Sequence, residues 1–133
     1  HNRRQAEYGD FLPELKADLQ ETLAIASRAG VRKEHIILDP GVGVGFAKTR
    51  EQNLEVLANL GGLRELGCPV LLGASRKSVI GLTLDVPVTE RLEGTLVTTV
   101  FAVLSGCSHV RVHDVKENVR AVRMAEAIAE YER

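Results

Sequence analysis

Apolar residues three and four positions apart predict four amphipathic helices along the chain. We expect the first to begin near Asp10, with Pro13 in its first turn, and to close at Gly30. The inward-facing positions of the four helices are predicted to be Leu12, Leu15, Leu19, Leu23 and Ala26; Leu54, Leu57 and Leu60; Leu92, Leu96, Val100, Val103 and Leu104; and Val115, Val119, Val122, Ala125 and Ile128.

Polar residues at the starts of the last three helices predict their caps. Thr49 with Gln52 three positions later has the spacing of a capping box, and Asp114 with Glu117 has a similar signature. Thr89 is expected to cap the third helix. That helix is apolar almost all round, which predicts that it is buried on two sides or lies in a subunit contact.

Three short β-rich runs alternate with these helices. They cover residues 35–39, 70–72 and 108–114, and proline or glycine bounds the first two. In the third run Val110 and Val112 point one way while Arg111 and His113 share the other face. After the second run, residues 77–81 predict a short helix and 82–88 a loop.

The alternation of helices and strands, with short connections, predicts an α/β fold of parallel βα units in a single domain over residues 1–133. In such sheets the ligand site lies at the carboxyl ends of the strands. The polar residues that this rule brings together are Asp39, Ser75, Arg76, Lys77, Arg111 and His113.

Composition narrows the possible partners. The chain has 133 residues, 44% hydrophobic and 26% charged, with a net charge of −1, and its basic residues are interspersed with acidic ones. Neither nucleic acid nor a membrane is therefore expected as a partner. Cys68 and Cys107 are predicted to be free thiols, which is typical of a reducing compartment, so a cytoplasmic location is expected.

The candidate site combines one carboxylate with several cations. The turn that contains Arg76 and Lys77 follows a buried strand and opens a helix, a junction that favours anions. Asp39 could accept two parallel N–H bonds from a guanidine-like heterocycle. Structural roles are the alternative: Asp39 could cap the glycine-rich loop, His113 could be a core imidazole, and Arg111 could pair with Asp114 or Glu117.

Several motifs occur in the order found in bacterial dihydropteroate synthase, and the chain resembles the C-terminal half of that family along essentially all of its length. They are Ile37-Leu38-Asp39-Pro40-Gly41, Gly45-Phe46-Ala47-Lys48-Thr49, Ser75-Arg76-Lys77-Ser78, Glu90-Arg91-Leu92-Glu93-Gly94-Thr95 and Arg111-Val112-His113-Asp114-Val115.

This resemblance implies about three strands and their helices from the C-terminal part of a TIM (β/α)₈ barrel. It implies a folate-pathway transferase that sulfonamides inhibit. In the implied reaction, 4-aminobenzoate displaces diphosphate from (7,8-dihydropterin-6-yl)methyl diphosphate and gives 7,8-dihydropteroate. Because three strands cannot close a barrel, the chain is expected to be a fragment that is inactive by itself.

The resemblance also assigns roles to residues. Asp39 would hold the pterin N–H groups, Lys77 would contact the pterin oxygen, and Arg111 and His113 would bind the diphosphate. Ser78 would receive the aminobenzoate carboxylate, with Arg76 beside it. Phe46 would line the aminobenzoate pocket, although a glycine loop two residues longer than the family's usual one leaves Val44 as the alternative.

The family implies a homodimer and a Mg²⁺ ion whose protein ligand is not in this chain. Two other readings remain open from the sequence. One is a pterin-binding domain like those of methyltransferases, which share the aspartate but not the basic set. The other is a non-catalytic assembly fragment whose apolar third helix, residues 90–105, serves only a dimer contact.

Overall fold

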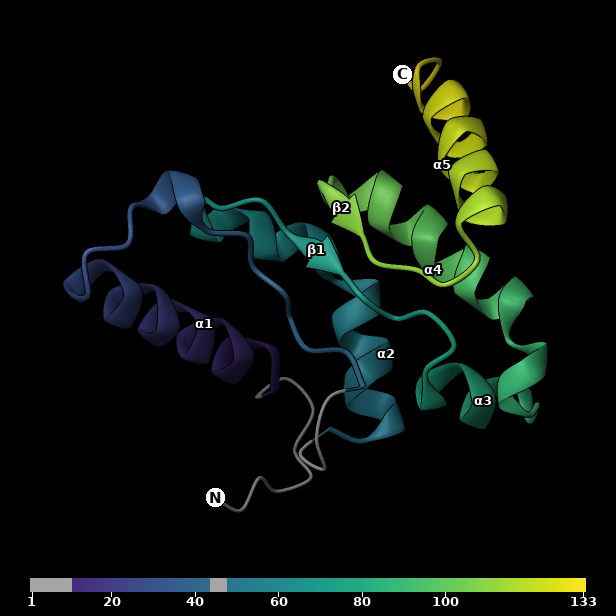
Figure 1. Cartoon of the computed structure of the whole chain (residues 1–133), viewed down its shortest axis with the longest axis horizontal. Helices are drawn as coiled ribbons and strands as arrows, with labels where there is room; N and C mark the ends of the chain where they lie inside the picture. The colour runs from purple at the N-terminus through teal and green to yellow at the C-terminus, as the bar shows by residue number, and fades with distance from the viewer. Residues whose placement is uncertain (1–10, 44–47) are drawn as a thin grey trace.

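A computed structural model describes residues 11–43 and 48–133 (Figure 1). Parallel strands in its centre are flanked by helices, which confirms an α/β fold of parallel strands. The elements are α1 (Phe11–Arg28), the 3₁₀ turn η1 (Lys33–His35), α2 (Arg50–Ala58), η2 (Leu60–Leu66), β1 (Leu71–Leu72), α3 (Ser78–Leu84), η3 (Val88–Glu90), α4 (Leu92–Ser105), β2 (His109–Val110) and α5 (Val115–Ala129).

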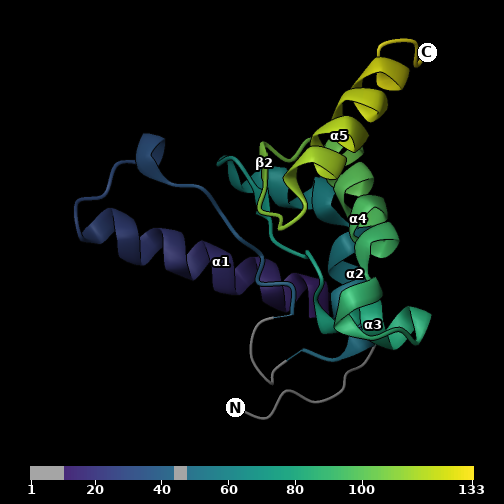
Figure 2. The same ribbon diagram turned by 45° about the vertical axis from the view of Figure 1, so that its right-hand side comes forward.

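The sheet joins three stretches that are far apart in the sequence. β1 pairs in parallel with β2, with Leu71 opposite His109, and Leu38 forms a parallel bridge to Val70 on the other side. All three stretches therefore point their carboxyl ends the same way. In Figure 1 and Figure 2, α1 and α5 lie at opposite ends of the molecule, with the strands between them.

The strands are shorter than the sequence predicts. Of residues 35–39, only Leu38 pairs with a neighbour, and His35 lies in η1. Of residues 108–114, only His109 and Val110 form a strand. Both stretches border β1 and have no further strand beside them among the described residues, so a ladder forms on one side only.

Several predicted helix boundaries are confirmed. α1 begins at Phe11 and is followed by Gly30, which has a φ of +91°. Thr49 and Gln52 exchange both hydrogen bonds of a capping box, at 3.0 and 3.1 Å. Asp10, near which the sequence predicts the start of this helix, lies outside the described residues.

Other local predictions are wrong. Helix α3 continues to Leu84, although residues 82–84 were expected in a loop. Thr89 lies in η3 and Arg91 takes the N-cap position of α4. Asp114 precedes α5 but its carboxylate makes no capping bond, because it pairs with Arg76 instead.

The buried face of α4 is also different from the prediction. Its buried residues are Thr95, Thr98, Thr99 and Ala102. Of the residues predicted to face inward, Leu92, Leu96, Val100 and Val103 are half-buried and Leu104 is exposed. Hydrophobicity alone misses the most buried positions because Thr95 and Thr99 have hydrogen-bond partners in the loop at Arg76 and in α5.

The main core lies between the strands and the helices that cover them. Its fully buried side chains include Val42, Val56, Leu60, Val70, Leu72 and Val79. Cys68 is buried and Cys107 is half-buried, and both are free thiols. No helix in the described part of the chain has the length and apolar character to cross a membrane.

Candidate functional site

The Lys77 side chain lies against Val42 and Gly43, in the part of the glycine-rich loop that the structure describes. Its Nζ donates a hydrogen bond to the Val42 carbonyl at 2.8 Å. A Cβ on Gly43 would approach Lys77 Cδ within 2.6 Å, and Gly43 has a φ of +74°, so glycine is required here twice over. Partial burial lowers the pKa of Lys77, and nearby Arg111 lowers it further, while Asp39 opposes the shift.

Arg111 directly follows β2, and Asp39 directly follows Leu38, which bridges to Val70; the two side chains face each other. Both terminal guanidinium nitrogens of Arg111 donate to Asp39 Oδ2 at 3.3 Å. The pair is part-exposed, with side-chain exposures of 58% and 38%. A Cβ on Gly73 would overlap the guanidinium of Arg111, so the carboxyl end of β1 provides the flat surface on which it rests.

The other oxygen of Asp39 stabilises its own loop. Oδ1 accepts the backbone N–H of Gly41 at 2.8 Å, which is the capping role considered from the sequence. Lys48 Nζ donates to the carbonyls of Pro40 and Gly41, and buried Asn53 accepts the N–H of Gly43 at 2.9 Å. Asp39 therefore both caps the loop and presents an oxygen to a cation.

His113 is held by Ser75 across the strand ends. Ser75 is buried, and its Oγ lies 2.8 Å from His113 Nδ1 and accepts the His113 backbone N–H at 3.1 Å. Because Nδ1 faces Ser75, Nε2 is the ring nitrogen that could contact a ligand. The ring itself is exposed.

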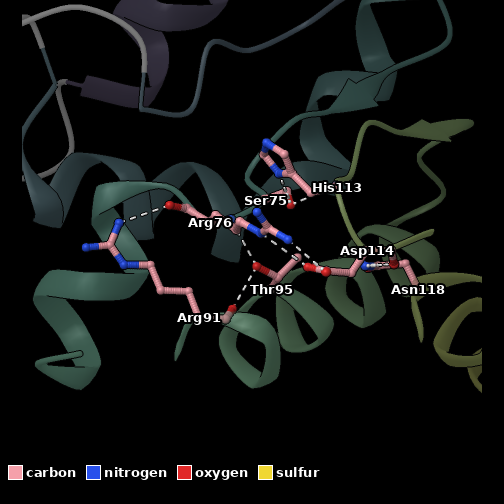
Figure 3. Close-up of polar contacts among 7 residues, drawn as sticks. All are labelled: Ser75, Arg76, Arg91, Thr95, His113, Asp114 and Asn118. Carbon is pink, nitrogen blue, oxygen red and sulfur yellow. Dashed lines mark hydrogen bonds and ion pairs between the residues drawn. The ribbon is translucent and has the colours of Figure 1, made fainter. Parts of the chain in front are cut away.

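Arg76 points away from the group formed by Asp39, Lys77 and Arg111. Its guanidinium forms an ion pair with Asp114, with Nη2 to Oδ1 at 2.9 Å (Figure 3). This hydrogen bond raises the pKa of Arg76. Arg76 has a φ of +60°, a left-handed conformation that non-glycine residues rarely adopt. The change of direction at this residue separates the two adjacent cations.

The structure thus brings together Asp39, Lys77 and Arg111, and places Ser75 and His113 at the neighbouring strand end. Ser78 is exposed at the start of α3. Phe46 and its alternative Val44 lie outside the described residues. The ligand roles of these residues, including a substrate contact for Arg76, stay predictions.

Sequence reasoning gave no role to three residues around this site. Thr95 and Arg91 contact the backbone of Arg76, and Asn53 holds Gly43. The motif of residues 90–95 supports the family resemblance but predicts no function for Arg91 or Thr95. The signal in the sequence is Thr95 itself, a polar residue within an otherwise apolar helix.

Metal binding has no support in the described part of the chain. No group of three or more His, Cys, Asp or Glu side chains there could hold an ion. Asp39 already uses both oxygens for Gly41 and Arg111.

Residues 1–113 match the family of pterin-binding enzymes. The chain belongs to this family. A dihydropteroate synthase of Clostridium beijerinckii is 54% identical over 129 residues, which cover 96% of the chain and 47% of that relative. The predicted resemblance to dihydropteroate synthase is thereby confirmed, and the chain spans about half the length of the curated relatives it matches.

Solved structures agree with this membership. A dihydropteroate synthase from Clostridium difficile, determined in the presence of pteroic acid, is 48% identical with a TM-score of 0.86, over 100% of this chain and 49% of that one. A Yersinia pestis dihydropteroate synthase in complex with a sulfonamide drug is 35% identical with a TM-score of 0.87, over 93% and 44%. These names do not favour the methyltransferase-like alternative.

Proposed function

We propose that the chain supplies the strand-end site of a dihydropteroate synthase, which condenses (7,8-dihydropterin-6-yl)methyl diphosphate with 4-aminobenzoate. The observation that carries this proposal is the pairing at Asp39, whose Oδ2 accepts two N–H groups of a guanidinium. The 2-amino and ring N–H groups of a pterin form a similar planar donor edge. Asp39 therefore suits a pterin once Arg111 moves aside.

Arg111 then becomes available for the diphosphate. When the pterin takes over Oδ2, the displaced guanidinium can bind the leaving group together with His113 Nε2. Lys77, which contributes a second positive charge beside that of Arg111, contacts the pterin oxygen. This exchange gives the Asp39 carboxylate N–H donors both before and after binding.

The chemistry follows from this placement of charge. The bond between the pterin methylene carbon and the diphosphate oxygen breaks, and its electron pair leaves with the diphosphate, which the cations stabilise. The ring nitrogen lone pair and the Asp39 carboxylate stabilise the methylene cation. The amine of 4-aminobenzoate forms the new C–N bond and then loses a proton. Ser78, with Arg76 nearby and Phe46 as the wall, receives the aminobenzoate carboxylate.

The decisive experiment compares two ligands that differ only in the diphosphate. We expect Arg111→Met to weaken binding of the dihydropterin diphosphate by about tenfold, because a charge-assisted bond is lost. The same change should strengthen binding of 6-hydroxymethyl-7,8-dihydropterin severalfold, because Arg111 no longer competes for Asp39. Calorimetry on the intact protein measures both.

Arg120→Met, which alters an exposed arginine on α5, is the matched control. Equal losses for the two ligands would contradict the exchange of partners at Asp39. Absence of binding by the unaltered protein would contradict the proposed function itself.

The fold proposal is that these strands form the C-terminal part of a TIM barrel. The support is the set of three parallel stretches with one common direction and open outer edges in the described part. We expect the 133-residue chain alone to give no turnover, since the strands that would close the barrel come from elsewhere. Normal dihydropteroate formation by the chain alone would contradict this. The reaction steps proposed for this chain do not involve the Mg²⁺ ion that the family implies.

A homodimer is proposed through the apolar side of α4. A groove of about 560 Å³ between α2, α3 and α4 is lined mainly by apolar side chains and contains none of the candidate site residues. Val97 and Phe101 line it and are about half exposed. Light scattering should show a dimer that Phe101→Glu converts to a monomer, whereas a monomeric unaltered protein would refute the contact.

A further inference from the structure

The turn at Arg76 is held by side chains that lie outside the strand-end site. The backbone N–H of Arg76 donates to Thr95 Oγ1 at 3.0 Å, and the Arg76 carbonyl accepts from Arg91 Nη1 at 2.9 Å (Figure 3). The Thr95 hydroxyl in turn donates to the Arg91 carbonyl at 2.8 Å. Both polar groups of the left-handed residue are therefore satisfied by the first turn of α4.

The same helix also holds the loop at Asp114. Thr99, one turn after Thr95, donates to Asn118 Oδ1 at 2.6 Å, and Asn118 Nδ2 donates to the Asp114 carbonyl at 2.8 Å. The Asp114 carboxylate pairs with Arg76, so these hydrogen bonds, together with the α4 backbone between Thr95 and Thr99, form a closed circuit. Its members are Thr95, Arg76, Asp114, Asn118 and Thr99.

Because three members of the circuit are buried, water cannot easily replace a hydrogen bond that they lose. Thr95 is 0% exposed, and Thr99 and Asn118 are 1% exposed. A buried donor that loses its partner pays the cost of its desolvation, whereas an exposed one finds water. The adjacent residues Lys77 and His113 extend directly from the two loops that the circuit joins.

We propose that Thr95 is a positioning residue for the strand-end site: its hydroxyl holds the left-handed turn at Arg76 from which Lys77 reaches the glycine-rich loop. The link to Lys77 is short, since the turn ends at the residue that donates to Val42. Thr95 itself touches none of Asp39, Lys77 or Arg111 by a hydrogen bond. As a role in catalysis, this inference rests on the proposed function.

Thr98 provides a matched control on the same helix. It is also a buried threonine, but its hydroxyl donates to the carbonyl of Thr95 within α4 and to neither loop. Replacing either threonine with valine keeps the volume and removes the hydroxyl. The two variants therefore differ in the contact with Arg76 and share the loss of a buried polar group.

The first measurement needs no substrate. Amide hydrogen exchange at Arg76 in the intact protein should become about tenfold faster in Thr95→Val and change less than about twofold in Thr98→Val. Thr95→Ser keeps the hydroxyl, so its exchange rate at Arg76 should stay near that of the unaltered protein, whereas exchange in Thr95→Ala should be faster. This second pair of variants tests the same contact if Thr95→Val fails to fold. Equal exchange in Thr95→Val and Thr98→Val would overturn the proposal.

The second measurement separates positioning from general loss of packing. Thr95→Val should weaken binding of the dihydropterin diphosphate by about fivefold, and by less than about twofold when Lys77 is already alanine. An effect of the same size in both backgrounds would overturn the proposal. If the unaltered protein does not bind this ligand, the proposed function fails, while the exchange result still decides whether Thr95 holds the turn.

Discussion

Arg76 and Lys77 are adjacent in the sequence but belong to two different regions of the molecule. Arg76 has a left-handed backbone, and its side chain pairs with Asp114 next to α5. Lys77 has an extended backbone, and its amine lies on the glycine-rich loop near Asp39. The contacts of Arg76 with Asp114, Thr95 and Arg91 form a brace. Lys77 belongs instead to the candidate site.

The difference shows that one positive φ, at Arg76, can direct two neighbouring cationic side chains to different partners. Two adjacent cations suggest a joint anion site, yet the turn at Arg76 directs them to opposite sides. Arg76 already has a carboxylate partner, while the Lys77 amine donates to a neutral carbonyl and lies beside a cation. We therefore expect changes at Lys77 to affect ligand binding and changes at Arg76 to affect stability.

The largest expected effect is that of Lys77→Ala on ligand affinity. Loss of a charge-assisted bond should weaken binding of the dihydropterin diphosphate by about 1–3 kcal/mol, measured by calorimetry. Lys116→Ala, which removes an exposed lysine from α5, should leave the affinity unchanged. Unchanged affinity in the Lys77 variant would show that Lys77 does not contact this ligand.

The lowered pKa of Lys77 predicts the next effect. An anion is attracted to the protonated amine, so its affinity falls as the pH rises through a pKa that lies below the ordinary value of 10.5. We expect a decrease of about tenfold over this range. The unfolded chain binds the proton more tightly than the folded one, so this group also makes folding more favourable as the pH rises through the same window.

Calorimetry at a series of pH values tests this, with Lys77→Met as the control. The variant has no amine to titrate and should lose this part of the pH dependence. A decrease of the same size in the variant would assign the titration to another group.

Gly43→Ala should have a smaller effect, and Gly30→Ala is its matched control. Both glycines have a positive φ, so each substitution should lower the free energy of unfolding by about 1 kcal/mol. Only Gly43 lies against Lys77, whereas nothing lies within 4 Å of a Cβ at Gly30. Denaturation and binding measured together should show a larger loss of stability for Gly43→Ala than for Gly30→Ala, and weaker binding for Gly43→Ala alone.

Asp114→Asn should produce the smallest effect. It removes the charge that faces Arg76, whose side chain is well exposed, so we expect a small decrease in Tm and no direct loss of affinity. Because salt screens such pairs, the decrease should shrink at high ionic strength. A loss of Tm that is independent of salt would mean that the carboxylate acts mainly as a hydrogen-bond acceptor.

Local sequence signals were sufficient where a few neighbouring residues decide the structure. The capping box at Thr49, the closing glycine of α1 and the apolar run at β1 depend on contacts within a few positions, and all three are present. The carboxyl ends of the strands were also predicted to gather the polar residues, and Asp39, Lys77 and Arg111 do meet there.

Partners distant in the sequence could not be predicted from such signals. Thr89 and Asp114 carry the residue types of helix caps, but Asp114 instead pairs with a residue 38 positions earlier. The buried threonines of α4 also depend on distant partners, because Thr95 binds Arg76 and Thr99 binds Asn118. Hydrophobic periodicity contains no information on such partners.

The sequence by itself determined the order of the elements, the parallel α/β class, the family likeness and the set of polar residues at the strand ends. Only the tertiary structure decided that Arg76 pairs with Asp114, that Lys77 reaches Val42, and that Asp39 presents one oxygen to Arg111. The physical reason is that these contacts depend on a left-handed turn at a non-glycine residue, and the side chains that hold its backbone, Thr95 and Arg91, lie farther along the sequence.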